Sequence, residues 1–399
     1  MIKRIKKIFS VKLLFKLPQK YDLVIFDNTG ISDLKLNLLK NQKYFVFKNR
    51  INEIDEVYIT PFLIFKILIN LRYLFKDFFI QDVYFLSLLQ SLKPKIVFTI
   101  IDTDFQFSKL GKILEKEDIK FVALQGAMRH VWLLQDYMYK KKLIKNDLNK
   151  KYFFPVYLCF SEYEKYQCLK LKINVKKFIL VGSLRLVNFL LEKESKVLKK
   201  KYDICLLSDY GAWLDRFDGV SLDILKQAEN GYIKLIEWSI EFCRSKNLKF
   251  VFSFKRRINT HDYFLEKSFY KNKLSEVNYN FLIENSSYNQ KDMIYKSYYS
   301  SFQSELTIAK TSTLLRETLA CNNKILACNL TNSNLFDFPI KGICSLNNCS
   351  FDEFEKRVEN ILKIKSSDYF SKIKENKNYL VYDSNPKSVI NSILKELMV

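Results

Sequence analysis

The chain of 399 residues contains few of the residues that mark several common architectures. It has two histidines, and its eight cysteines include no Cys-x-x-Cys pair, which argues against a zinc site. Several cysteines lie in apolar runs, as expected in a reducing, cytosolic compartment. Six prolines and eight glycines exclude collagen-like and proline-rich structures. Hydrophobic residues make up 48% of the chain, enough for a packed core.

Short apolar runs alternate with longer segments of helical period along the whole chain. In the first half these runs are residues 21–27, 44–47, 95–102, 120–126, 156–161 and 178–183. In the second half they are residues 202–209, 249–255, 279–285, 306–312 and 324–329. Apolar strands followed by helices are typical of parallel sheets that are covered on both faces. Two such series predict an α/β protein with two Rossmann-like domains.

The charged stretch 191–203 reads as the linker between these domains. We therefore expect an N-terminal domain over 1–190, a C-terminal domain over 204–385 and a closing helix over 386–399. The chain lacks both G-x-G-x-x-G and G-x-x-x-x-G-K-[ST], so neither a dinucleotide dehydrogenase nor a P-loop NTPase is supported. Two Rossmann-like domains without these fingerprints favour the GT-B architecture, in which a nucleotide-sugar binds in an interdomain cleft.

Positive charge is concentrated in the first half of the chain. Residues 1–200 carry a net charge of +19, against +4 for the remainder. The first twenty residues hold seven basic and no acidic residues, with Ile2, Ile5, Phe9 and Leu13 on one helical face. This pattern predicts an amphipathic helix on anionic lipid, with a basic surface helix as the alternative. The N-terminal domain is accordingly expected to present a basic, membrane-facing surface.

A second apolar stretch, residues 61–79, is interrupted by charged residues and is not expected to span a bilayer. Two placements remain open for it. It lies either on a bilayer or in the core as a helix with a basic outer edge.

The stretch 306–329 is the clearest candidate for a phosphate site. A strand ends at Lys310, and Thr311, Ser312 and Thr313 then supply hydroxyl and backbone N–H groups at the start of a helix. The positive end of the helix dipole makes this a phosphate cradle. Glu317, one turn later, is placed to accept hydrogen bonds from a ribose. An ordinary Ser/Thr cap with a capping-box glutamate is the alternative.

The stretch 251–262 runs from a strand into Lys255, Arg256 and Arg257, with His261 shortly after. Cations at the end of a strand neutralise a phosphate or a sugar carboxylate. A solvated basic turn is the alternative reading.

The stretch 206–219 places Asp209, Asp215 and Asp218 just beyond a strand end. A carboxylate there acts as a base, or as a nucleophile towards an anomeric carbon. Helix capping by Asp209 or Asp218 remains an equally open interpretation.

Three strands of the first half also end in polar residues, which we expect to form one wall of a site. These residues are Gln125, Gly126, Arg129 and His130 after the first strand, Glu162 and Glu164 after the second, and Ser183 and Arg185 after the third. Glu162 is the candidate for proton transfer on the acceptor side, whereas Glu164 is expected to face solvent. Residues 27–30, Asp-Asn-Thr-Gly, offer a tight turn for close ligand approach, although this is also ordinary turn chemistry.

These motifs together resemble bacterial GT-B glycosyltransferases of surface-carbohydrate biosynthesis. The resemblance spans roughly residues 20–335 and rests on a strand ending LQG, a strand ending Ser-Glu-Tyr, a following VGSLR and the late segment STLLRETLACNNKILACN. It is similar to the retaining β-Kdo transferases and, more distantly, to the capsule Kdo and sialic-acid transferases. Where the latter have a His-Pro dipeptide, this chain has Lys-Arg-Arg.

The resemblance implies a CMP-activated ulosonic acid as the donor substrate, with no cofactor and no metal. Thr311, Ser312 and Thr313 would hold the CMP phosphate with help from Lys255 and Arg257. Glu162 matches the proton-transfer position, and Asp209, Asp215 and Asp218 compete for the nucleophile. It further implies a lipopolysaccharide or capsule glycan as acceptor, and a cytoplasmic protein peripheral on the inner membrane. UDP- or GDP-sugars are alternative donors.

Two readings from other classes remain. The isoelectric point near 9.4 suggests a nucleic-acid-binding protein. However, the basic residues form no dense tract with interleaved aromatics beyond the N-terminus, and no nucleic-acid-binding motif is visible. We therefore expect no nucleic-acid partner. A non-catalytic scaffold with a GT-B fold is the other reading.

Overall fold

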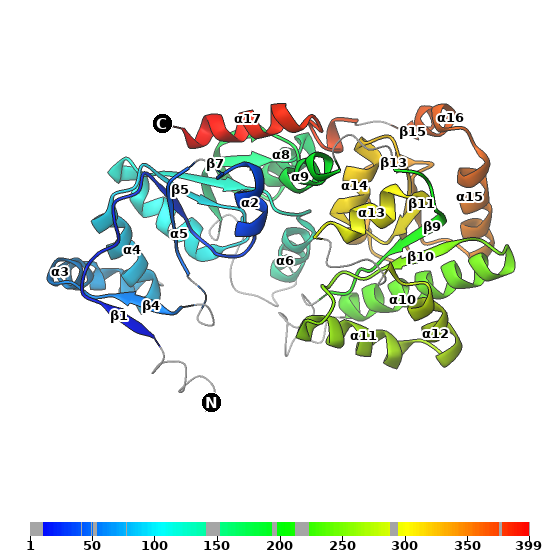
Figure 1. Ribbon diagram of the computed structural model, residues 1–399, viewed down its shortest axis with the longest axis horizontal. Coiled ribbons are helices and arrows are strands. Elements are labelled where there is room, and N and C mark those ends of the chain that lie inside the picture. Colours follow the sequence, from blue (N-terminus) through cyan, green and yellow to red (C-terminus); the bar gives the residue numbers. More distant parts are fainter. Residues whose placement is uncertain are drawn as a thin grey trace. The chain divides into compact units, whose positions relative to one another are not determined.

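The computed structural model describes residues 11–40, 42–48, 50, 54–76, 78–140, 152–193, 198–211, 223–287, 294–374 and 377–398. The chain forms two compact units (Figure 1). Unit 1 comprises the residues up to Gly126, Tyr139–Asn188 and those from Asn385 onward. Unit 2 comprises Ala127–Met138 and Phe189–Ser384. The main division between the two units thus falls between Asn188 and Phe189, two residues before the predicted boundary at 190.

Unit 1 is built on a parallel sheet of six strands in the order β3-β2-β5-β6-β7-β8. These strands are β2 (Leu23–Ile25), β3 (Tyr44–Val46), β5 (Ile96–Thr99), β6 (Lys120–Leu124), β7 (Phe153–Cys159) and β8 (Asn174–Leu180). Its helical segments are α2 (Ile31–Asn37), α3 (Pro61–Asn70), η1 (Leu71–Lys76), α4 (Ile80–Leu92), α5 (Phe105–Leu114), η2 (Glu115–Glu117), α8 (Glu162–Lys170), α9 (Leu184–Glu192, up to Asn188) and α17 (Pro386–Leu397). A separate parallel pair joins β1 (Lys12–Leu14) to β4 (Glu56–Tyr58).

The sheet of unit 1 is apolar on both faces because successive strand residues point to opposite sides. One face packs with α2, α9 and α17 in a core that includes Leu23, Ile25, Phe98 and Val122. The alternate residues, such as Phe26 and Phe121, meet rings of α4 and α5 on the other face, for example Phe107. A buried strand therefore needs a continuous apolar run, which is the pattern that the sequence shows.

Helix α17, drawn in red in Figure 1, brings the C-terminal part of the chain onto unit 1. Asn385 caps its first turn by accepting a hydrogen bond from Ser388 N at 3.2 Å. Val389 and Ile393 are fully buried against the sheet. Near its end Glu396 lies 2.9 Å from Lys120 Nζ and 3.0 Å from Lys177 Nζ. Apolar burial and this ion-paired carboxylate together hold the helix to β6 and β8.

Unit 2 is built on a parallel sheet of five strands in the order β10-β9-β11-β12-β14. These strands are β9 (Tyr202–Leu207), β10 (Phe250–Ser253), β11 (Ser304–Ala309), β12 (Lys324–Asn329) and β14 (Ser345–Asn347). Its helical segments are α6 (His130–Lys140, up to Met138), α10 (Asp223–Ser245), α11 (His261–Lys273), α12 (Glu276–Glu284), α13 (Lys296–Phe302), α14 (Thr313–Ala320), η5 (Asn334–Phe336), α15 (Phe351–Lys363), α16 (Ser366–Ser371) and η6 (Lys377–Tyr379). A short antiparallel pair joins β13 (Lys341–Gly342) to β15 (Ile373–Lys374).

Helices cover the sheet of unit 2 as well. Trp238 of α10 contacts Phe354 of α15 with ring centres 5.7 Å apart, and Phe281 of α12 lies 5.7 Å from Phe250 of β10. Helices α13 and α14 lie against one another, where Ser301 Oγ is 2.8 Å from Thr318 Oγ1. Each unit is thus a Rossmann-like set of parallel strands and helices, which confirms the predicted α/β fold class.

The predicted strand over 279–285 is wrong, because these residues lie mainly in α12. Ser275 caps this helix by accepting from Asn278 N, and Leu282 is its one buried residue. A short apolar run cannot by itself distinguish a strand from a helix. The fifth strand of the sheet is instead β14, whose sequence Ser-Leu-Asn carries little apolar signal.

The structure also bears on the predictions for residues 1–20 and for residues 61–79. Residues 1–10 lie outside the described residues, but Lys12–Leu14, which the predicted helix includes, form a strand that pairs with β4. The alternative of a core helix within 61–79 is wrong, since α3 buries only Leu63 and Asn70. Within the described ranges no helix is long and apolar enough to cross a membrane.

Candidate functional site

Three neighbouring strands of unit 2 end in charged residues. Asp209 follows β9, Lys255 follows β10 and Lys310 follows β11. Because these strands are adjacent and parallel, in the order β10-β9-β11, their carboxyl ends meet at one edge of the sheet. Ligands of doubly wound sheets bind at this edge. We call these three residues the strand-end cluster.

Asp209 and Lys310 form a largely buried ion pair within this cluster. Lys310 Nζ lies 2.8 Å from Asp209 Oδ2, and the two side chains are 4% and 14% exposed. The ammonium group also lies 5.0 Å from the centre of the Phe336 ring and 3.4 Å from the carbonyl oxygen of Ala228. A buried cation needs such partners to offset its lost hydration. The pair is neutral overall, and it fixes the Lys310 ammonium group between β9 and β11.

The buried carboxylate of Glu266, on α11, organises the loop after β10. It accepts hydrogen bonds from the backbone N–H groups of Lys255 at 3.0 Å and Arg256 at 2.8 Å, and from the hydroxyl of Ser208. Ser208 Oγ also lies 2.6 Å from Tyr270 Oη. Burial raises the pKa of the Glu266 carboxyl above its ordinary value, and these hydrogen bonds act in the opposite direction. One carboxylate thereby ties the ends of β9 and β10 to α11.

Helix α14 begins three residues after Lys310. Ser312 is its N-cap, with Oγ accepting a hydrogen bond from Leu314 N at 3.2 Å. This hydrogen bond is the ordinary Ser/Thr cap, which the sequence predicts as the alternative to a phosphate cradle. A capping side chain is compatible with a ligand at the same helix end. The hydroxyl of Thr313 accepts a hydrogen bond from Met128 N at 2.9 Å, within unit 2. The role of Thr311, Ser312 and Thr313 in phosphate binding stays a prediction.

Glu317 lies inside unit 2 and is 2% exposed. Its carboxylate accepts a hydrogen bond from Tyr298 Oη at 2.7 Å, which links α14 to α13. It does not bond back to the N-cap, so no capping box forms here. Its contact with a ribose stays a prediction.

The basic loop after β10 lies only partly at the surface, because Arg256 is half-buried and desolvation lowers the pKa of the Lys255 ammonium group. Lys255, Arg257 and His261 are exposed, and His261 is the first residue of α11. Arg256 Nη1 lies 3.4 Å from Asp262 Oδ2. Several cations therefore stand at the edge that carries the strand-end cluster.

The predicted residues of unit 1 lie at the corresponding edge of its own sheet. Gln125 is buried, and its side-chain oxygen accepts a hydrogen bond from Phe160 N at 2.7 Å, which joins the ends of β6 and β7. At Gly126 a Cβ atom would lie 2.6 Å from the carbonyl oxygen of Ile100, so the close approach of two backbones requires glycine there. Both residues therefore have structural roles that do not depend on a ligand.

Ser183 is also buried, and its hydroxyl accepts a hydrogen bond from Leu186 N at 3.3 Å near the start of α9. Arg185 Nε lies 3.6 Å from Asp33 Oδ2. Arg129 belongs to unit 2, where it is buried with Nη1 3.4 Å from the carbonyl oxygen of Met128.

The two glutamates of α8 differ from each other in burial. Glu162, the proton-transfer candidate, is partly exposed and lies 3.6 Å from Lys165 Nζ. Glu164 is fully buried and accepts a hydrogen bond from Ser161 Oγ at 2.9 Å, so the expectation that it faces solvent is wrong. The reason is local, because Ser161 caps α8 and its hydroxyl turns the Glu164 carboxylate inward.

The turn at 27–30 is built by local hydrogen bonding. Asp27 Oδ1 accepts a hydrogen bond from Thr29 N at 2.6 Å, and Gly30 adopts a left-handed φ of 77°. Arg50 binds Asp27 Oδ2 through two nitrogens, at 3.0 and 3.1 Å. These contacts account for the turn without a ligand.

Some predicted residues lie outside this description. Asp215 and Asp218 are outside the described residues, and for His130 only the backbone is described. In the part of the chain that the structure does describe, no group of three or more His, Cys, Asp or Glu side chains could hold a metal ion. The choice among the three candidate nucleophiles thus stays a prediction.

Sequence reasoning assigned no role to several side chains that shape this edge. They are Lys310, Glu266, Ser208 and Tyr270. Lys310 carries a usable signal, since a lysine that ends the apolar run Leu-Thr-Ile-Ala is unusual for a buried strand. Glu266 carries none, because the groups that it binds lie 10, 11 and 58 residues away.

A small cavity lies at the charged edge of unit 2, and a larger, mainly apolar cavity lies in unit 1. A cavity of about 20 Å³ beside Asp209 and Lys310 has room for about one water molecule. A larger cavity of about 220 Å³ lies between β3, β4 and α4 and is lined mainly by apolar groups such as Phe45 and Phe85. Its one lysine, Lys48, pairs with Asp55. The larger cavity therefore does not suit a phosphate.

Comparison with known proteins shows the fold of this chain but does not assign it to a family. A scan against models of protein families and a search of curated proteins found no match. Among solved structures, the chain is similar to a "putative UDP-N-acetylglucosamine 2-epimerase" from Listeria monocytogenes. The TM-score is 0.53 at 11% identity, over 95% of this chain and 96% of that one. This likeness shows a shared α/β fold of two Rossmann-like sets, the GT-B type.

Two further solved structures match over similar lengths. The UDP-GlcNAc 2-epimerase of Methanocaldococcus jannaschii has a TM-score of 0.47 at 14% identity, over 96% of this chain and 99% of that one. A glycosyltransferase from Rickettsia africae has a TM-score of 0.42 at 12% identity, over 95% and 94%.

Proposed function

We propose that the protein is a glycosyltransferase whose donor is a nucleotide-activated sugar. The observation that carries this proposal is the strand-end cluster of unit 2, together with the start of α14. A buried cation, a partly exposed basic loop and a helix N-terminus stand at the edge where doubly wound sheets bind their ligands. A nucleotide phosphate is the ligand that this combination of groups favours.

The same groups suit the chemistry of sugar transfer. When the bond between a nucleotide phosphate and the anomeric carbon breaks, negative charge grows on the departing phosphate. A helix N-terminus and fixed cations stabilise that charge in the transition state. In this proposal Thr311, Ser312 and Thr313 hold the phosphate, and Lys255 and Arg257 neutralise it without a metal ion.

A CMP-activated ulosonic acid, Kdo or a close relative, is the donor that the resemblance to β-Kdo transferases supports. Such a donor carries a carboxylate besides its phosphate, and Lys255 and Arg257 offer two cations for the two anionic groups. Asp209 supplies a carboxylate for the anomeric centre, in competition with Asp215 and Asp218. Glu162 would transfer the proton at the acceptor, and His261 is a further candidate.

The proposed acceptor is a lipopolysaccharide or capsule glycan at the cytoplasmic face of the inner membrane. Support comes from the resemblance and from the net charge of +19 over residues 1–200, which favours an anionic surface. Neither a metal nor a resident cofactor enters the proposal.

A UDP-sugar enzyme is the second candidate. The Listeria protein with the shared fold is named for UDP-N-acetylglucosamine 2-epimerase activity, and its name favours a uridine nucleotide. Both candidates place the nucleotide at the same edge of unit 2. They differ in the base, and in whether the sugar moves to an acceptor or is rearranged.

Substitution of Ser312 by Glu tests the phosphate site. A carboxylate at this N-cap would repel a phosphate, so we expect Ser312→Glu to weaken CMP binding by tenfold or more, about 1.4 kcal/mol. The matched control is Ser275→Glu, which removes the N-cap of α12 in the same unit. Calorimetric titration of each full-length variant with CMP and with UDP measures the effect. Equal affinity of Ser312→Glu and the unmodified protein would contradict the site.

A further inference from the structure

Helix α3 carries its apolar side chains on the outside. Thr60 caps the helix by accepting a hydrogen bond from Leu63 N at 3.1 Å, and Pro61 occupies the first turn. Of its ten residues only Leu63 and Asn70 are buried. The large side chains that it exposes are Phe62, Ile64, Phe65, Leu68 and Ile69. A helix that faces water shows the opposite pattern, so this surface suits an apolar environment.

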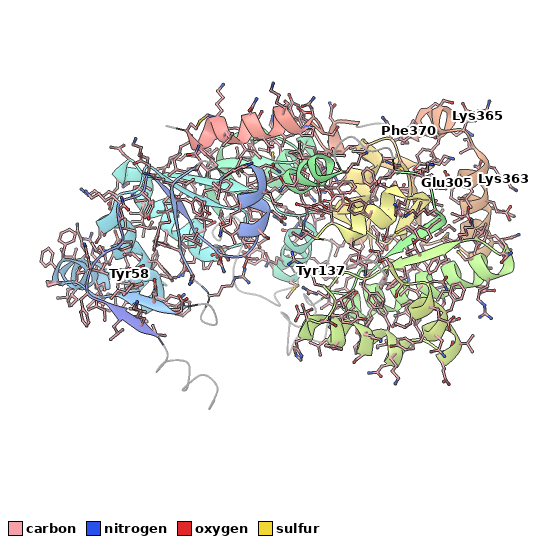
Figure 2. The ribbon with its side chains drawn as sticks, viewed as in Figure 1. Tyr58, Tyr137, Glu305, Lys363, Lys365 and Phe370 are labelled. Carbon is pink, nitrogen blue, oxygen red and sulfur yellow. The ribbon has the colours of Figure 1, made fainter. Side chains whose placement is uncertain are left out.

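The exposed apolar surface continues beyond α3. In η1, Leu74 is exposed and Phe75 is 94% exposed, and Phe79 and Ile80 at the start of α4 are exposed as well. We call the exposed apolar side chains of residues 61–76 the apolar face. Figure 2 shows side chains extending outward from α3, near the label of Tyr58 on β4.

The strand next to β4 adds more surface of the same kind. β1 pairs with β4, and Ile59 N donates to the carbonyl oxygen of Leu14, just before α3 begins. Leu13 and Phe15 are exposed on this strand and just after it. Two segments that are far apart in the sequence therefore present apolar groups in the same part of unit 1.

Both segments are basic as well as apolar. Residues 61–76 contain three basic and no acidic residues, and residues 11–20 likewise contain three basic and no acidic residues. Lys66 Nζ lies 5.7 Å from the centre of the Phe62 ring, and the guanidinium of Arg72 lies 5.2 Å from the Tyr73 ring. The cations thus stand among the rings of the apolar face rather than on a separate surface.

We propose that the apolar face docks on an anionic lipid bilayer. Its side chains would enter the boundary between headgroups and acyl chains, while Lys66 and Arg72 meet lipid phosphates. A bilayer offers hydrocarbon and negative charge at one surface, which matches both properties of the face. A second copy of this chain matches less well, because a symmetric contact would bring the same cations together. The inference rests on the proposed function, whose membrane partner it assigns to one surface.

Vesicle sedimentation of the full chain tests this assignment. The vesicles contain phosphatidylcholine, either alone or mixed with phosphatidylglycerol. Phe65→Glu places a charge in the centre of the apolar face, and we expect it to weaken binding to the anionic vesicles about tenfold or more. The matched control is Phe264→Glu on α11, because Phe264 is 54% exposed and Phe65 is 59% exposed. The control should bind like the unmodified protein.

A second variant tests the charges without touching the apolar side chains. In Lys66→Gln/Arg72→Gln, we expect weaker binding to anionic vesicles and a smaller loss of binding on adding salt. Vesicles of phosphatidylcholine alone should bind all variants weakly. CMP titration of the same proteins separates the two proposals, since Phe65→Glu should leave nucleotide binding unchanged.

Three results would overturn the assignment. The first is equal vesicle binding by Phe65→Glu and the unmodified protein. The second is an equal loss of binding in Phe264→Glu. The third is a Phe65→Glu protein that changes from dimer to monomer in light scattering while its vesicle binding is retained, because the face would then be an interface between copies. None of these results bears on nucleotide binding. The CMP titration tests nucleotide binding, and with it the proposed function, separately.

Discussion

Single side chains far apart in the sequence set the geometry of the strand-end cluster. Glu266 binds two backbone N–H groups and a hydroxyl from the ends of two strands, and it is fully buried. Lys310 meets Asp209 across 101 residues. Neither partner is apparent from spacing, because each contact depends on which strands become neighbours in the sheet.

At the residue scale we predict that Glu266→Ala destabilises unit 2. The substitution leaves two backbone N–H groups and the hydroxyl of Ser208 without this acceptor, which costs about 2 kcal/mol or more of the free energy of unfolding. Urea unfolding measures the change. Glu241→Ala, at an exposed position of α10, serves as the control and should change the free energy by less than about 0.5 kcal/mol. Equal effects of the two substitutions would refute the role of Glu266.

A strand or helix can be predicted from the sequence where its apolar pattern is long. Where the pattern is short, the neighbouring residues decide which element forms. The buried strands have continuous apolar runs, so the alternation of strands and helices in both units could be predicted. Residues 279–285 could not be assigned correctly, since Tyr-Asn-Phe-Leu-Ile-Glu-Asn suits a strand or a helix and the Ser275 cap decides. β14 could not be predicted either, because an edge strand of three residues needs little apolar character.

At the element scale we predict that Glu396 holds α17 in a pH-dependent way. Burial of this carboxylate opposes its ionisation, but the hydrogen bonds and charges of Lys120 and Lys177 outweigh burial and lower its pKa below the usual 4.5. A group with a lowered folded-state pKa stabilises the fold above its unfolded-state pKa, and this contribution is lost as the pH falls through the folded-state value. Glu396→Gln should therefore cost about 1 kcal/mol at neutral pH and less below about pH 4.5.

Urea unfolding of the unmodified protein and Glu396→Gln at pH 7 and near pH 3.5 checks this expectation. The difference in the free energy of unfolding should shrink on acidification. A difference that is the same at both pH values would show that the carboxylate's charge does not stabilise α17.

At the scale of the whole molecule, more of the fold than of the candidate site could be predicted from the sequence. Two series of parallel strands and the missing nucleotide-binding fingerprints lead to two Rossmann-like units, which the structure has. The site residues remain predictions because a strand end identifies an edge of a sheet without identifying its ligand. Gln125 shows the difficulty, since its place at a strand end suggests binding while its hydrogen bond to Phe160 accounts for it structurally.

The most direct test of a nucleotide-sugar enzyme is thermal unfolding of the full chain with CMP, UDP, GDP, ADP or a short DNA duplex. A ligand that binds the native state alone raises the unfolding temperature by mass action. We predict a rise with CMP, and a rise with UDP instead would favour the second candidate. No response to any nucleotide, with a salt-sensitive response to DNA, would contradict the glycosyltransferase account and point to the net charge of +23 as the functional feature.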